Sequence, residues 1–318
     1  SSVSIRSQTL NPPWTLLLFT PFSLLDYSLA RIAWLMITIV LIILSVRQFW
    51  ILLHGSENKL WLAFLISFMF APTYSVLSKG QVTPWVLLGI TGLLLFSEEK
   101  LNVWLTGASI VLISVKPQVF YLIWPALGLW VIFQRRWKLL VSGACVWLLT
   151  ILILVMVNPK IFVQYLSAVQ EYPYDQWATP TLGSYLRLFW LGVDKFWIQY
   201  LPAVLGTGWG IIHFLRHKNY WLWREQIILL SIVSIITAPY AWTYDQIIIL
   251  PAILAATSWL SITVKPFMVI IWGLYMGINL ADSLLHTKLD EFWFIWLAPA
   301  YTLWYLIILY THKNREPS

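Results

Sequence analysis

Two lysines stand in polar connections that lead into apolar segments of the chain. In Lys79–Pro84 a Thr-Pro pair follows the lysine, and in Lys116–Gln118 the lysine directly precedes a proline. Proline is typical of the first turn of a helix, and a helix N-terminus carries partial positive charge that binds anions. A lysine there is unfavourable unless an anion joins it. We therefore expect a phosphate-binding pocket lined by Lys79, Gln81, Lys116 and Gln118. The alternative is that both lysines extend to lipid headgroups.

A carboxylate among aromatic residues follows later, in the segment Tyr240–Gln246. Asp245 either caps the apolar helix that follows or faces the phosphate pocket. Its aromatic neighbours either stack on a sugar ring or anchor the chain at the membrane surface. A second aromatic and acidic cluster, Glu171–Trp177, has the same two interpretations. The candidates for sugar or acceptor contact are Tyr240, Trp242, Tyr244, Trp177 and His286, and the candidate bases are Asp245 and Asp175.

The composition decides what kind of element positions these residues. Of 318 residues, 60% are hydrophobic and only 10% are charged, whereas about a quarter of a soluble domain is charged. The bilayer must therefore be the solvent, and a segment that crosses it must be a helix or part of a closed barrel. The apolar runs are continuous rather than alternating, which favours helices. We expect no metal site, because the histidines are scattered.

The apolar runs predict an all-α, polytopic membrane helix bundle that forms a single domain, 1–318. Residues 1–28 are too short and too interrupted by proline to span, so we expect an outer interfacial or re-entrant segment. The stretch 158–197 is expected to be a long outer loop. We expect about eleven transmembrane helices, near 29–49, 60–77, 84–96, 102–115, 118–133, 139–157, 198–215, 226–238, 246–262, 266–280 and 293–311.

The charged residues predict the orientation of the bundle. The connection Gln134–Lys138 is the most basic, and most other cations fall on the same side under this span count. By the positive-inside rule this side is cytoplasmic, so the candidate residues lie at the outer face. Orientation also accounts for the net charge of +7, and we expect no nucleic-acid partner. No Asn-x-Ser/Thr sequon occurs in the sequence, which fits a bacterial cytoplasmic (inner) membrane.

Six short motifs resemble glycosyltransferase family 87, a branch of the C-type membrane glycosyltransferases that use polyprenyl-phosphate sugars. They share the order and spacing of the family over most of the chain. They are Asn11-Pro12-Pro13 with Pro21, Gly80-Gln81, Lys116-Pro117-Gln118, Arg135-Arg136-Trp137, Ser184 to Leu188, and Ala238-Pro239-Tyr240 to Tyr244-Asp245.

The resemblance implies a fold of the C-type glycosyltransferase kind and an inverting hexosyltransferase. A hexose, often mannose, would pass from a polyprenyl-phosphate donor to a lipid or glycan acceptor at the outer face. A carboxylate would deprotonate the acceptor hydroxyl while cations hold the departing phosphate. The donor is a substrate, so no cofactor is implied. The expected partners are the lipid-linked donor, membrane lipids and other membrane subunits.

The sequence departs from the family at the base. Family members carry an aspartate in the first outer loop, after an N-terminal span, and this chain begins beyond that position. Asp245 and Asp175 are therefore fallback candidates only. Two other functions stay open, a non-catalytic subunit or scaffold of a membrane complex and a transporter of lipid-linked sugar. Against transport, no inverted repeat is evident and few ionisable residues lie in mid-span.

Overall fold

The computed structural model describes residues 11–99, 102–171, 177–192, 194–260 and 265–314. Every regular element among these residues is a helix. The α-helices are α1 (Tyr27–Leu52), α2 (Leu60–Met69), α3 (Ala71–Lys79), α4 (Thr83–Leu94), α5 (Val103–Ile113), α6 (Ile123–Phe133), α7 (Trp137–Val157), α8 (Ile161–Glu171), α9 (Leu182–Tyr185), α10 (Leu201–His217), α11 (Trp223–Thr237), α12 (Leu250–Leu260), α13 (Lys265–Leu285) and α14 (Leu297–Lys313).

Short helical turns of other kinds join them. The 3-10 turns are η1 (Pro13–Leu18), η2 (Thr20–Leu24), η3 (Glu57–Lys59), η7 (Phe196–Tyr200), η8 (Lys218–Tyr220), η9 (Thr243–Ile249) and η10 (Glu291–Trp296), and the π turns are η4 (Leu95–Glu99) and η6 (Leu186–Leu191).

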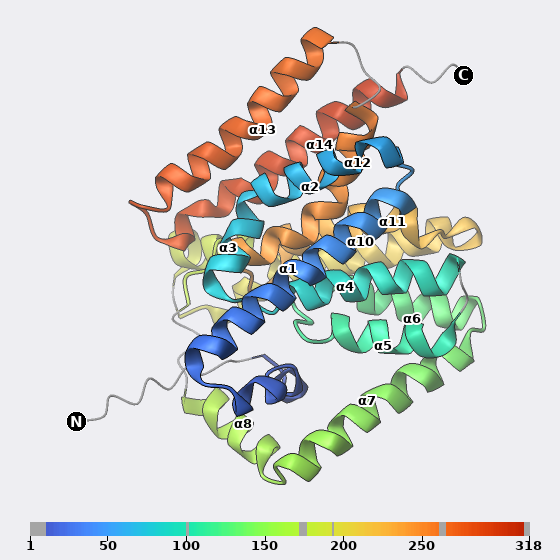
Figure 1. Cartoon of the computed structure of the whole chain (residues 1–318), viewed down its shortest axis with the longest axis vertical. Coiled ribbons are helices and arrows are strands. Elements are labelled where there is room, and N and C mark those ends of the chain that lie inside the picture. The colour runs from blue at the N-terminus through green and yellow to red at the C-terminus, as the bar shows by residue number, and fades with distance from the viewer. Residues whose placement is uncertain (1–10, 100–101, 172–176, 193, 261–264, 315–318) are drawn as a thin grey trace.

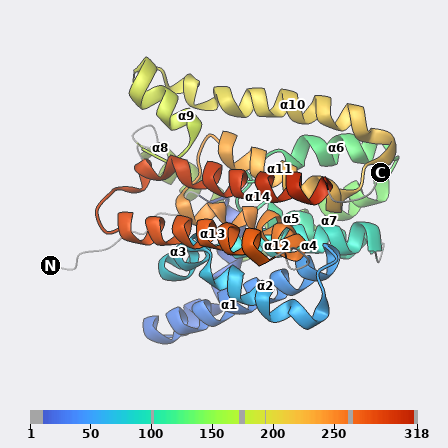
Figure 2. The same ribbon diagram turned by 90° about the horizontal axis from the view of Figure 1, so that it is seen from above.

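The long helices lie side by side and share one general direction (Figures 1 and 2). One end of the bundle, which we call the site end, holds α3, α8, α9 and the connection between α13 and α14 (left in Figure 2). The opposite end holds the start of α7 and the C-terminal end of α14. The polytopic all-helical prediction is confirmed.

The predicted number of spans is not confirmed. Within the described residues, five helices are long and apolar enough to cross a membrane, or six if the bent pair of α2 and α3 counts as one span. An 11-residue helix such as α5 or α6 rises only about 16 Å, which is half of the ~30 Å hydrocarbon core. The apolar runs predicted where helices occur, but helix length decides what can span.

The centre of the bundle is the continuous helical stretch of η9 and α12. Almost all of its side chains are buried, whereas those of α7 are mostly exposed. Small residues along α12, among them Ala252, Ala255 and Ala256, are fully enclosed. Small side chains allow helix backbones to approach closely in membranes. The central stretch therefore carries Tyr244 and Asp245 into the interior at the site end.

The N-terminal segment packs onto the chain just before Lys116. The indole of Trp14 donates to the backbone oxygen of Ser114 at 3.2 Å, and the Thr15 hydroxyl donates to that of Val115 at 3.3 Å. The two short helices η1 and η2 thus help to fix the backbone that presents Lys116. A place for residues 1–28 at the membrane surface stays a prediction.

The segment 158–197, expected as a loop, is largely helical where it is described. Helices α8 and α9, η6 and the start of η7 occupy it. Helix α8 is amphipathic, with an apolar stripe beside polar residues such as Gln164 and Gln170. The helix was not predicted, because the segment that follows it is rich in proline and aromatic residues and the whole stretch was interpreted as a loop. Arg187, from η6, is completely buried in this segment.

Gly89 of α4 is a contact point with α5, and we expect Gly89→Ala to destabilise the protein. A Cβ atom at this position would lie 2.7 Å from the backbone oxygen of Ser109 and 2.9 Å from the backbone nitrogen of Ile113. Backbone atoms cannot move aside cheaply, so the expected loss is about 1–3 kcal/mol of unfolding free energy. Thermal unfolding in detergent measures it. Gly273→Ala is the control, because a Cβ there meets nothing within 4 Å; equal melting temperatures for both variants would contradict the prediction.

Candidate functional site

A buried ion pair lies at the site end, between the turn after α5 and the start of the central stretch. The ammonium of Lys116 lies 2.7 Å from Oδ1 of Asp245, and both side chains are almost fully enclosed. Thr83, at the start of α4, donates its hydroxyl to the same carboxylate oxygen at 2.7 Å. The other oxygen accepts the backbone N–H of Trp242 at 3.1 Å. Both oxygens of Asp245 are therefore engaged.

The interpretation of Asp245 as a helix cap is close to what the structure shows. Asp245 is the third residue of η9, and Trp242 occupies the N-cap position. The carboxylate reaches back to the backbone N–H of Trp242, as acidic residues at this position commonly do. The same carboxylate also bonds Lys116 and Thr83, so it joins three segments that are far apart in sequence. Its predicted role as a base is not tested by this geometry.

The other contacts of the Lys116 ammonium are with neutral groups. Its ammonium donates to Oε1 of Gln81 at 3.2 Å and to the Thr83 hydroxyl at 3.4 Å. It also lies 4.6 Å from the ring centroid of Tyr244, within the range of a cation–π contact. The predicted partnership of Lys116 with Gln81 is thus present, whereas Gln118 is half-buried and takes part in none of these bonds.

Lys79 approaches the same tyrosine. Its ammonium lies 5.4 Å from the Tyr244 centroid and forms an ion pair with Glu291, at the start of η10. Unlike Lys116, its side chain keeps 37% of its accessible surface. The other oxygen of Glu291 accepts the backbone N–H of Thr243 at 3.3 Å. Tyr244 is therefore close to both a buried lysine and a half-exposed one.

Lys79 also lines a groove between α1 and α3. The groove has a volume of about 790 Å³, and its described lining includes the cations Arg31 and Lys79. Tyr27, Tyr74 and Ser78 add hydroxyl groups, and Leu35, Ile39 and Leu77 add apolar surface. The groove is therefore polar at the site end and apolar along α1, and Lys116 is not among its lining residues.

The structure overturns the helix-terminus argument for these lysines. Lys79 is the last residue of α3, and Gly80 follows in the left-handed conformation with φ +61°. A cation at a helix C-terminus is favourable, and Gly80 supplies the backbone freedom that such a terminus requires. Lys116 precedes a series of turns, and α6 begins only at Ile123. Neither lysine opposes a helix dipole, and each already has a carboxylate partner.

The predicted aromatic contacts do gather beside this cluster. Trp177 lies 6.1 Å from Trp242 and 5.8 Å from Tyr240, measured between ring centroids. Trp242 in turn stacks on Tyr244 at 6.4 Å. A row of rings therefore leads from the segment before α9 to the two lysines. Aromatic faces of this kind can contact a sugar ring or anchor the chain at the membrane surface.

Two further residues were predicted for the site, Asp175 and His286. Asp175 falls outside the described residues. His286 lies near the end of α13, with its Nδ1 atom 3.2 Å from Oδ1 of Asp282 and its ring 4.0 Å from that of Phe294. His286 is therefore tied to Asp282 rather than to the row of rings.

The described residues do not bring three His, Cys, Asp or Glu side chains together as metal ligands. His213 and His217 of α10 do stand one helical turn apart, with ring centroids 4.3 Å from each other. Nε2 of His213 lies 2.7 Å from Gln226, and Nδ1 of His217 lies 2.8 Å from the backbone oxygen of His213. This pair is accounted for by hydrogen bonds within the bundle.

Four polar residues of this end were missed from the sequence. Thr83 was noted only as part of a Thr-Pro pair, and Arg31, Arg187 and Glu291 were not singled out. Arg31 and Glu291 each lie near the start of an apolar run, a signal too common to select them. Arg187 donates to the backbone oxygen of Trp177 at 3.1 Å, and its Nε and Nη1 atoms have no hydrogen-bond partner within the described residues. Its position in the motif Ser184 to Leu188 is the one signal that pointed to it.

Comparison with known proteins places this arrangement in a family. A family model described as glycosyltransferase family 87 matches residues 10–243, which is more than half of the chain. The match includes both lysines and Arg187, and it ends just before Tyr244 and Asp245. No curated protein and no solved structure matches the chain. The extent of this match, over a chain of apolar helices, shows that the chain belongs to glycosyltransferase family 87, a family of membrane glycosyltransferases.

Proposed function

We propose that the protein transfers a hexose, with mannose as the first candidate, from a polyprenyl-phosphate donor to a lipid or glycan acceptor. The observation that carries the proposal is the groove between α1 and α3, which combines the half-exposed Lys79 with Arg31 at one end and apolar surface along its length. A lipid phosphate needs both features, cations for its headgroup and apolar surface for its chain.

The two lysines have different roles in this proposal. Lys79, with Arg31, holds the lipid phosphate as it departs from the sugar and stabilises the charge that develops on it. Lys116 is too deeply enclosed for this and is held by Asp245, so we assign it to positioning. It helps to fix Tyr244, whose ring is near both ammonium groups.

The sugar would lie along the row of rings formed by Trp177, Trp242 and Tyr244. The acceptor hydroxyl must lose its proton to a base. Asp245 has both oxygens engaged and is almost fully buried, so this geometry favours a structural role for it. The inverting outcome is what the family resemblance implies.

One observation favours a second candidate function, a non-catalytic subunit of a membrane complex. Two carboxylates of the cluster, Asp245 and Glu291, are each already paired with a lysine. A general base must be free to take a proton, so a chain with these carboxylates alone would bind the donor without transferring the sugar.

We place the site end at the outer face of a bacterial cytoplasmic membrane, on the positive-inside distribution of the sequence.

Reconstitution of the full chain in liposomes with a labelled polyprenyl-phosphate hexose tests the proposal. The expected result is a labelled glycosidic product that is lost in Lys79→Ala and Arg31→Ala. Arg47→Ala is the matched control, because it removes an exposed arginine from the same helix about 24 Å away. Donor binding without a product would support the non-catalytic subunit. Movement of intact donor across the bilayer would support transport, and a failure to bind the donor at all would refute the proposed groove.

A further inference from the structure

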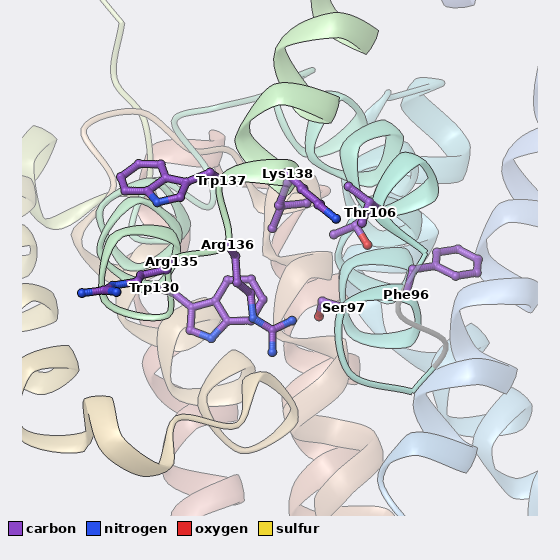
Figure 3. Close-up of a pocket in the computed structure, with 10 residues that line it drawn as sticks. Phe96, Ser97, Thr106, Trp130, Arg135, Arg136, Trp137 and Lys138 are labelled. Atoms are coloured by element: carbon purple, nitrogen blue, oxygen red, sulfur yellow. The ribbon is translucent and has the colours of Figure 1, made fainter.

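A second polar pocket lies at the end of the bundle opposite the site end, where α6 turns into α7 (Figure 3). Its volume is about 460 Å³, and three of its ten described lining residues are cations, namely Arg135, Arg136 and Lys138. None of those ten residues is a carboxylate. Arg136 and Lys138 therefore bring positive charge to a pocket that the proposed donor site does not use.

Polar groups from η4, α5 and the connection between α6 and α7 line the pocket. The guanidinium of Arg136 lies over the ring of Trp130, 4.5 Å from its centroid, and it points toward the Ser97 hydroxyl, while Lys138 extends toward Thr106 (Figure 3). Ser97 is only 4% exposed, and its Oγ has no hydrogen-bond partner among the described residues. A buried hydroxyl without a partner is costly. A ligand with acceptor oxygens would satisfy the hydroxyl and both cations at once.

An apolar groove continues from this pocket along the side of the bundle. It lies between α5, α6 and α7, has a volume of about 540 Å³, and shares Trp137 and Leu139 with the polar pocket. Its walls are almost entirely aliphatic and aromatic. The groove is next to the surface of α7, whose side chains are mostly exposed. A ligand in both spaces would have an anionic head and a long apolar tail.

We propose that this double cavity binds an anionic glycerophospholipid of the surrounding membrane, with its phosphate at Arg136, Lys138 and Ser97 and an acyl chain in the groove. A soluble phosphate would leave the groove unused. The positive-inside rule makes this end cytoplasmic, and anionic phospholipids are concentrated in that leaflet, where basic pockets between helices bind their headgroups. The lipid would hold α7 against α5 and α6 across a groove that protein side chains leave open.

Native mass spectrometry of the purified full chain, titrated with phosphatidylglycerol, tests the charge of the head. Phosphatidylcholine with the same acyl chains is the matched ligand, and we expect it to bind at least about tenfold more weakly. Arg136→Ala and Lys138→Ala are each expected to weaken phosphatidylglycerol binding about tenfold. Arg135→Gly is the control, because its guanidinium points away from the other two cations (Figure 3). The backbone of Arg135 has φ +53°, a conformation that favours glycine. The Arg135→Gly variant should therefore keep the native fold, and its loss of affinity for phosphatidylglycerol should be much smaller than that of the other two variants.

Two further substitutions separate lipid binding from folding. Ser97→Ala should weaken phosphatidylglycerol binding several-fold without lowering the melting temperature, since it removes an unsatisfied buried group. Gly128→Leu should fill the groove and displace the lipid, because a Cβ there meets nothing within 4 Å, and Gly273→Leu on α13 is the same change outside the groove. Equal binding of the two phospholipids, or unchanged binding in Arg136→Ala and Ser97→Ala, would overturn the proposal. Displacement of phosphatidylglycerol from this pocket by equimolar polyprenyl phosphate would overturn the choice of ligand.

Discussion

Lys116→Met is expected to lower the free energy of unfolding by about 3–5 kcal/mol, and Asp245→Asn by a similar amount. Either change leaves the other partner of a 2.7 Å ion pair buried without its counter-charge. The loss spreads beyond the pair, because Asp245 also bonds Thr83 and the backbone of Trp242. This is the largest stability effect that we expect from any substitution at the site end.

A double-mutant cycle separates the pair from its surroundings. Lys116→Met with Asp245→Leu replaces both charges by apolar groups of similar size, and such replacements often cost little. The double variant should therefore be more stable than either Lys116→Met or Asp245→Leu alone, so the two changes should be non-additive, as expected for residues in contact. Denaturant unfolding in detergent micelles measures all four proteins.

The pair of Lys79 and Glu291 is the internal control for this cycle. Lys79 keeps 37% of its side-chain surface, and exposed ion pairs contribute only about 0–1 kcal/mol. Lys79→Met should thus leave the unfolding free energy nearly unchanged. If Lys116→Met and Lys79→Met destabilise the protein equally, burial does not distinguish the two lysines and their assigned roles fail.

Opposite changes in lipid-phosphate affinity are expected from the two partners of the half-exposed pair. Lys79→Ala removes a charged donor from the groove and should weaken binding of polyprenyl phosphate about 10- to 100-fold, since a hydrogen bond to a charged group contributes ~1.5–3 kcal/mol. Glu291→Gln should strengthen binding, because it frees Lys79 from a competing carboxylate. Glutamine keeps an oxygen that can accept the backbone N–H of Thr243, as Glu291 does at 3.3 Å, so the local fold should persist.

Equilibrium binding of a fluorescent polyprenyl phosphate to the purified full chain measures both changes. Arg47→Ala, at the far end of α1, is the control for a general loss of positive charge. A phosphate that binds at Lys79 must compete with Glu291, so affinities that fall in both variants would show that the ion pair is structural. If the affinity is unchanged in both variants, the phosphate does not bind in the groove between α1 and α3.

The sequence by itself determined the class of the protein and the position of its helices. Continuous apolar runs leave no alternative to membrane helices, because lipid cannot satisfy exposed backbone groups, and helices occur at each predicted run. Asp26 is another feature fixed by local sequence, since its carboxylate caps α1 by accepting hydrogen bonds from the backbone N–H groups of Ser28 and Leu29 at 3.0 and 3.1 Å. The family motifs, read in order along the chain, indicated the family that the comparison then showed.

Only the tertiary structure decided which charges meet. Lys116 and Asp245 are separated by 129 residues in sequence, and Lys79 pairs with Glu291 from another helix. Nothing local in either lysine distinguishes the buried one from the half-exposed one. Local rules fix caps, turns and apolar faces, whereas an ion pair depends on how helix ends are brought together by packing, and that depends on the whole chain at once.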